Sequence, residues 1–254
     1  MRIRGLAPVL TAAVLATTRG GALVQADAAT GPTHVKQLAE AQTRLYAAYD
    51  ANTGVSPTHC GKGQRASGFH GTFLLPVFVG TDTPEPKTIR CRTTARKVLV
   101  DAGGFAITED ANGPSYPLPF PDGDLVAFTR PNLNAICDDV VANLMPSLGI
   151  PPAVVTVDGI AEEPVAVTTR WFIARHSPTL ETQYADSIAL GHPGRLATAF
   201  CGYKALVHLH PGRHVVTVDY STISGAPGTI YTYQVNVRRH DNRTSSRPDG
   251  EGVR

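Results

Sequence analysis

Apolar and polar residues alternate regularly between Lys204 and Tyr220. A period of two is typical of a strand that buries one face and exposes the other. The pair Pro211–Gly212 in the middle is a turn signal, because proline presets φ and glycine accepts a positive φ. The segment therefore predicts a β-hairpin whose inward side chains are Ala205, Val207, Leu209, Val216, Val218 and Tyr220.

The burial pattern also suggests how the two arms pair. A turn over His210–Arg213 places Val207 opposite Val216. A slip by one residue would bring Val216 onto the histidine face of the hairpin, which burial forbids. We therefore expect the arms to pair with each other in this register, with His208 and His210 pointing into solvent.

Two other segments carry the period of an amphipathic helix. Residues 34–50 place apolar side chains on roughly one face, and residues 133–144 do so at positions i, i+3, i+7, i+8 and i+11. We expect a helix in each, the second ended by Pro146. Cys137 shares the apolar face of the second helix, so a disulfide can attach that helix to the sheet on which it packs.

Short apolar or alternating runs predict the remaining strands, at residues 73–79, 97–100, 105–108, 154–157, 165–173 and 230–237. Gly103–Gly104 is expected to break the chain between the second and third of these runs, and Asp158–Gly159 to form a turn. Residues 174–200 show no clear period. Short strands separated by turn signals predict a mainly β fold, an antiparallel β-sandwich with one or two α-helices inserted, in a single domain over residues 29–237.

The beginning of the chain is typical of a secretory signal peptide. Arg2 and Arg4 precede an apolar run over residues 5–16, and the small residues of Ala26–Ala28 follow. We expect cleavage after Ala28 and an extracellular protein. The apolar run is shorter than the ~18 residues that span a bilayer, so no stable membrane anchor is expected. Residues 238–254 are charged and nearly free of apolar side chains, which predicts a disordered tail.

Charge and motifs narrow the function classes. The formal net charge of +2 comes from residues 1–28, which hold three Arg and one Asp, so the rest of the chain is formally neutral. A nucleic-acid-binding protein needs a basic face, and this composition argues against nucleic acid as a partner. The nucleophile elbow, the zinc-binding HExxH helix, the phosphate loop and the dinucleotide fingerprint are all missing. We expect a non-catalytic protein without a cofactor; a hydrolase with catalytic residues assembled from distant Asp, Glu and His is the alternative.

Four cysteines follow the signal segment: Cys60, Cys91, Cys137 and Cys201. An even number in a secreted chain indicates two disulfides, with three connectivities open. We expect Cys91–Cys137 and Cys60–Cys201. A four-cysteine metal site is disfavoured because no C-x-x-C pair occurs.

Two sets of side chains are candidates for binding. His208 and His210 would lie about 7 Å apart on one strand face, a spacing that suits two ligands of one metal ion, although a solvated polar face is the simpler interpretation. Tyr116 and Phe120 lie in a proline-rich stretch, and Tyr184 and His192 lie in residues 174–200. Aromatic side chains on loops grip sugars or peptides, or only pin down their own loops. The expected ligand is extracellular, a carbohydrate or another component of the cell envelope.

Six short motifs follow one another along the chain: Gly71–Val77, Arg90–Cys91, Cys137, Thr156–Gly159, Leu209–Val216 and Tyr233–Val237. In this order they resemble a group of uncharacterised secreted bacterial proteins with a β-sandwich-like pattern. The resemblance spans roughly residues 57–237. It implies an extracellular location and that fold, and it implies no catalytic residue.

Overall fold

The computed structural model describes residues 32–47, 60, 71–76, 87–111, 116–117, 125–175, 181–221 and 230–239. The expected signal peptide over residues 1–28 and nearly all of the expected tail lie outside this set. Within it the chain is mainly β, with few helices. The helical segments are α1 (Pro32–Ala47), α2 (Arg130–Asp139), the π-helical η3 (Val140–Leu144), α3 (Met145–Ser147) and α4 (Glu181–Ala189). Each of these helices is too short or too polar to pass through a bilayer.

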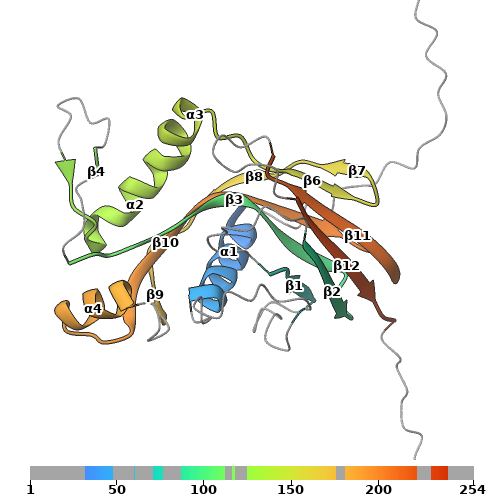
Figure 1. The fold of residues 1–254 in the computed structure, drawn as a ribbon, viewed down its shortest axis with the longest axis horizontal. Helices are drawn as coiled ribbons and strands as arrows, with labels where there is room; N and C mark the ends of the chain where they lie inside the picture. Colours follow the sequence, from blue (N-terminus) through green and yellow to red (C-terminus); the bar gives the residue numbers. More distant parts are fainter. Residues whose placement is uncertain are drawn as a thin grey trace, which may run out of the picture.

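The strands form two large sheets (Figure 1). The β10 sheet has the order β1–β3–β10–β8, and β9 pairs with β10 as well. Its strands are β1 (Thr72–Leu74), β3 (Lys97–Thr108), β8 (Val165–Thr168), β9 (Phe172–Arg175) and β10 (Arg195–His208).

The β11 sheet has the order β2–β12–β11–β6–β7. Its strands are β2 (Lys87–Thr93), β6 (Val154–Val157), β7 (Ile160–Glu162), β11 (Gly212–Asp219) and β12 (Ile230–Val237). A separate pair joins β4 (Tyr116–Pro117) to β5 (Leu125–Val126). Both large sheets are mixed, because β1 runs parallel to β3 and β2 runs parallel to β12. The expectation of purely antiparallel sheets is therefore wrong.

The expected hairpin around Pro211–Gly212 is also wrong in its pairing. β10 pairs with β3, β8 and β9, whereas β11 pairs with β12 and β6, so the two arms belong to different sheets. Val207 lies opposite Val98 rather than Val216. The predicted inward face is nevertheless confirmed, whereas Lys204, which was expected on the solvent-facing side, is buried. Val207, Leu209, Val216 and Val218 are buried in one core cluster that both sheets share, and His208 and His210 are exposed.

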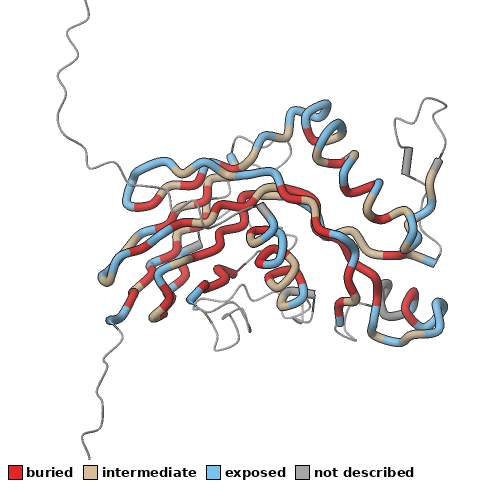
Figure 2. The backbone as a smooth tube through the Cα atoms, turned by 180° about the vertical axis from the view of Figure 1, so that it is seen from behind, coloured by how far each residue is buried: buried red, intermediate tan, exposed pale blue. Residues whose placement is uncertain are grey.

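β10 is the central strand of its sheet, and most of its residues are buried (Figure 2). Its odd-numbered residues face the core shared with the β11 sheet at one end and helix α2 at the other. Its even-numbered residues Phe200 and Leu206 face α1. Figure 1 accordingly shows α1 and α2 on opposite sides of β3 and β10. A strand buried on both faces reads as a nearly continuous apolar run, which explains why residues 195–203 show no clear period.

A bulge in β3 explains the glycine pair that was expected to break the strand. Between Gly202 and Lys204 on β10, the facing strand β3 runs from Gly104 to Asp101 and so holds one extra residue. The extra residue switches which side chains face the core, so that Val100 before the bulge and Ile107 after it face the same side of the sheet. Gly104 has φ +144, and a Cβ on Gly202 would overlap the carbonyl oxygen of Gly103. The glycines therefore permit close approach within one continuous strand.

Three further expectations change in detail. The run 165–173 forms β8 and β9 rather than one strand, because the backbone leaves β10 between them and the Trp171 N–H donates to Asn134 Oδ1 of α2 at 2.7 Å. Residues 174–200 contain α4, which was not expected. Pro146 does not end the second helix. The π-turn before it bonds the Met145 N–H to the Val140 carbonyl, which accommodates proline where an α-helical turn would clash.

Candidate functional site

A groove of about 780 Å³ lies over the outer face of the β11 sheet, where β2, β12 and β11 run side by side. Its polar lining consists of Arg90, Arg92, Arg213, His214, Gln234 and Asn236. The other faces of these three strands hold core residues such as Ile89, Val216 and Tyr233. The groove therefore lies on a rigid, packed sheet.

Strand register arranges the lining in two rows that cross the sheet. Arg92, Asn236 and Arg213 face one another on β2, β12 and β11. Arg90, Gln234 and Val215 form the next row. Neighbouring strands lie about 4.8 Å apart, so each row offers a guanidinium group and an amide within the length of one sugar ring or phosphodiester unit.

The three arginines of the groove differ from Arg44 and Arg130 in their ion pairing. Arg44 pairs with Glu40, and Arg130 pairs with Glu109. Arg90, Arg92 and Arg213 are exposed, and within the described residues none of them forms an ion pair. Their charge is therefore available to an anion from outside the chain.

His214 is part of the lining of the groove, and Asp158 pairs with it. His214 Nδ1 lies 2.7 Å from Asp158 Oδ2, and His214 Nε2 lies 2.7 Å from the His210 carbonyl oxygen. The Val215 N–H donates to Asp158 Oδ1. The Val215 N–H lowers the pKa of Asp158, against the opposing effect of burial and with help from the His214 hydrogen bond. The carboxylate thus stays ionised and is directed at the backbone and the imidazole rather than at the arginines.

The predicted turn at Asp158–Gly159 positions this carboxylate. Both residues have positive φ, 52° and 81°, as a tight turn between antiparallel strands requires. The turn joins β6 to β7 and brings Asp158 beside β11.

The disulfides correct the expected pairing. Cys60 is bonded to Cys91 and Cys137 to Cys201, so neither Cys91–Cys137 nor Cys60–Cys201 occurs. Cys91 lies on β2 of the β11 sheet, whereas Cys137 lies on α2, which packs on the β10 sheet. The Cys60 N–H donates to the Arg90 carbonyl at 3.0 Å, so the first disulfide holds Cys60 against the edge of the groove.

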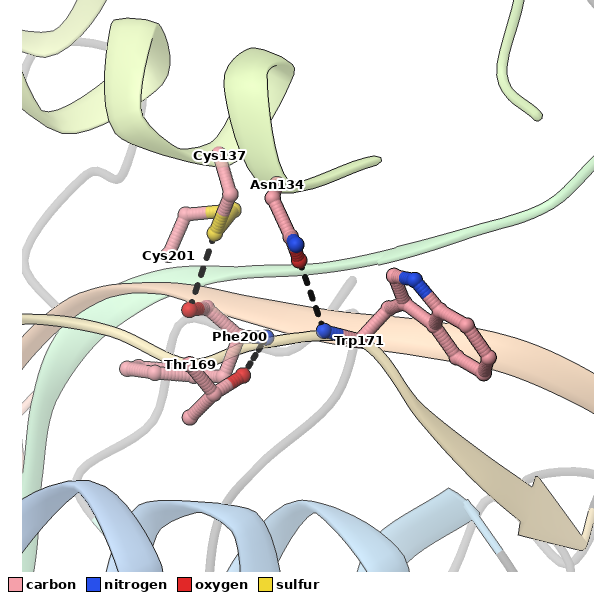
Figure 3. Close-up of a disulfide and its surroundings, with 6 residues drawn as sticks. All are labelled: Asn134, Cys137, Thr169, Trp171, Phe200 and Cys201. Carbon is pink, nitrogen blue, oxygen red and sulfur yellow. Dashed lines mark hydrogen bonds between the residues drawn. A yellow bond between two sulfur atoms is a disulfide. The ribbon is translucent and has the colours of Figure 1, made fainter. Parts of the chain in front are cut away.

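The second disulfide fixes α2 on β10 (Figure 3). Cys137 Sγ also contacts the Phe200 carbonyl oxygen at 2.9 Å, and the Phe200 N–H donates to Thr169 Oγ1 at 2.8 Å. The expectation that Cys137 ties its helix to the sheet is confirmed, with Cys201 as its partner.

A second cluster of charged groups joins α2 to the turn after α4. Glu109 accepts two hydrogen bonds from Arg130, at 2.8 and 2.9 Å, and one from the Ala197 N–H at 2.7 Å. His192 Nε2 lies 2.8 Å from Glu109 Oε1 and 2.6 Å from Arg130 Nη2. Burial opposes ionisation of Glu109, but these hydrogen bonds outweigh it and hold its pKa at about 2. The Glu109 carboxylate is therefore fully engaged within the fold.

Those of the other predicted binding residues whose side chains the structure describes are not part of the groove lining. His192 belongs to the Glu109 cluster. Tyr116 is part of β4 and Tyr184 part of α4, but their side chains lie outside the described residues, as does Phe120 altogether. His208 and His210 are at the surface, and within the described part of the chain no three His, Cys, Asp or Glu residues are close enough to hold a metal ion.

Sequence reasoning missed the arginine groove. Its only local signals are Arg90 and Arg92 at i and i+2, and Gln234 and Asn236 at the same spacing. Such spacing places each pair on one face of a strand. It does not show that β2 and β12 are neighbours, since they are far apart in sequence.

No protein-family model, no curated protein and no solved structure matches the chain.

Proposed function

We propose that this chain is a secreted, non-catalytic binding module that holds an acidic glycan polymer of the cell envelope in the groove over the β11 sheet. The observation that carries the proposal is a set of three exposed guanidinium groups, Arg90 and Arg92 on β2 and Arg213 on β11, which flank β12 and form no ion pair among the described residues.

The lining suits this ligand chemically. A guanidinium group binds a carboxylate or phosphate through two parallel hydrogen bonds. The amides of Gln234 and Asn236 both donate and accept, as recognition of sugar hydroxyls requires. The groove extends over three neighbouring strands, which suits an extended polymer.

The test is a binding titration of the folded protein with a polyuronate, with a polyglycerol phosphate and with a neutral glucan. We expect binding of an acidic polymer, no binding of the neutral one, and weakening as salt is raised, because exposed charges are screened. The two acidic polymers distinguish a carboxylate ligand from a phosphate ligand.

The double substitution Arg92→Ala and Arg213→Ala should weaken this binding at least about tenfold, at about 1.4 kcal/mol per factor of ten. The matched control is Arg175→Ala, an exposed arginine on β9 outside the groove. Equal binding of wild type and the double variant, or no binding to either acidic polymer, would disprove the proposal.

The location and architecture of the module are part of the same proposal. Export is supported by the signal-like pattern of residues 1–28 and by two disulfides, which persist in oxidising compartments. We also propose that the two sheets stack as a β-sandwich, supported by the core cluster to which both contribute. A crystal structure with the sheets packed about 10 Å apart would agree, and sheets that diverge would not.

A further inference from the structure

A lysine and an aspartate face each other inside the protein, away from the groove. Lys204 on β10 is directly opposite Asp101 on β3. Lys204 is 1% exposed and Asp101 9%. Nζ of the lysine lies 3.0 Å from Oδ2 of the aspartate. The pair is thus held in contact by the backbones of two central strands.

The surroundings of the amine are apolar. The Phe200 ring lies 3.8 Å from Lys204 Nζ, and Leu206 lies on the same face of β10. Burial lowers the pKa of Lys204, and the attraction of Asp101 opposes this effect only in part. Where both charges are removed from water, moving one proton from Nζ to Oδ2 neutralises the pair. The result is a neutral amine beside a carboxylic acid.

We propose that Lys204 and Asp101 are joined in the mature protein by an intramolecular isopeptide bond that forms after folding. The lone pair of the neutral Nζ attacks Cγ of Asp101, and a new N–C bond forms. The Cγ–Oδ2 bond breaks, and Oδ2 leaves as water with one proton that it received from the ammonium group and a second one from Nζ. The products are one secondary amide and one water, and no oxidant or co-reactant is consumed.

The backbone around the bulge favours this step. The Gly103 N–H donates to Asp101 Oδ1 at 2.9 Å, so it stabilises the charge that develops on this oxygen while Oδ2 departs. Condensation of a free amine with a free acid is unfavourable in water. Two groups fixed in contact have effective concentrations that reach about 10⁵–10⁸ M, and this favours the bond inside the fold.

Intact-mass spectrometry of the purified, denatured protein with its disulfides reduced tests the proposal. The expected mass is one water below that calculated from the sequence of the mature chain. Trypsin should fail to cleave after Lys204 and should release a branched peptide that joins the segment beginning at Val98 to Leu196–Arg213. A mass equal to the value calculated from the sequence, together with normal cleavage after Lys204, would overturn the proposal.

The substitution Asp101→Asn gives a matched control. Asparagine can form the same amide by releasing ammonia instead of water, so the cross-linked variant should have the same mass as the cross-linked wild type. Lys204→Met cannot form the bond, and its mass should equal the calculated value. The result for the wild type decides the question even where a variant fails to fold. It is also independent of the groove, because Lys204 and Asp101 are not part of its lining.

Discussion

The outer face of the β11 sheet and the α1-covered face of the β10 sheet differ in the exposure and pairing of their basic side chains. On the first, Arg90, Arg92 and Arg213 are exposed and lack carboxylate partners among the described residues. On the second, Lys204 is buried and directly contacts Asp101. Exposed arginines cost the fold little and remain free for a ligand, whereas a buried amine must be paired or neutralised. Basic residues are thus exposed to solvent on one sheet and held in internal contacts on the other.

The largest effect on stability is expected when one partner of the buried pair is removed. Lys204→Met removes the partner of the buried Asp101 carboxyl group, together with the cross-link that we propose. We expect the free energy of unfolding to fall by at least about 3–5 kcal/mol, the loss that is typical of a buried pair left with one member. Urea denaturation measures the change. Lys97→Met, at the partly exposed start of β3, is the control and should shift the free energy of unfolding by less than about 0.5 kcal/mol.

The disulfide between α2 and β10 should contribute nearly as much. Replacing Cys137 and Cys201 together by alanine should lower the free energy of unfolding by about 4 kcal/mol, because their sequence separation is 64 residues. The Cys60–Cys91 bond, with a separation of 31 residues, should contribute about 0.6 kcal/mol less. Urea denaturation of both double variants compares them. A larger loss for the Cys60 and Cys91 variant would contradict this ranking.

Acid should weaken the Glu109 cluster next. The pKa of Glu109 is about 2 in the folded protein against an ordinary 4.5, so its contribution is fully present above about pH 4.5 and is lost as pH falls towards 2. The full loss corresponds to about 3 kcal/mol. Unfolding measured across this range, beside Glu109→Gln as control, checks the prediction. The variant should show a shallower decline, and equal declines would refute this assignment.

The smallest effect on stability is expected in the groove. Arg92→Ala and Arg213→Ala, each alone, should change the free energy of unfolding by less than about 0.5 kcal/mol, since neither arginine has an ion-pair partner among the described residues. Urea denaturation again measures it. A loss above about 1 kcal/mol would show that these arginines support the fold, and the contrast between the two sheets would disappear.

The sequence predicted the buried faces of the strands better than it predicted which strands pair. Alternation correctly placed Val207, Leu209, Val216 and Val218 inside, because the side-chain period follows from strand geometry alone. It could not show that the chain crosses from one sheet to the other at Pro211–Gly212. A strand pairing and a crossing between sheets bury the same valines, so the burial pattern does not distinguish them.

The predicted cysteine pairing was wrong, and the groove was not predicted, for a related reason. Each depends on which strands become neighbours, and β2 meets β12 across more than half of the chain. Arg92 and Arg213 share a row of the sheet only because each of them lies opposite Asn236 on β12. The bulge that aligns Lys204 with Asp101 is likewise invisible until β3 and β10 are paired. Local spacing can reveal a face, but a site assembled across strands requires the tertiary register.

The position of β10 in the chain sets the order in which the protein can be completed. β10, β11 and β12 all lie after Gly194, yet they are the strands on which β1, β3, β8 and β9 on one side, and β2 and β6 on the other, are assembled. In a chain that ends before Arg195, β2, β8 and β9 would have no strand partner, and β1–β3 and β6–β7 would be isolated pairs with exposed edges, which associate with other chains. Neither sheet can close until the last quarter of the polypeptide is present, so premature termination should yield aggregates rather than a smaller stable protein.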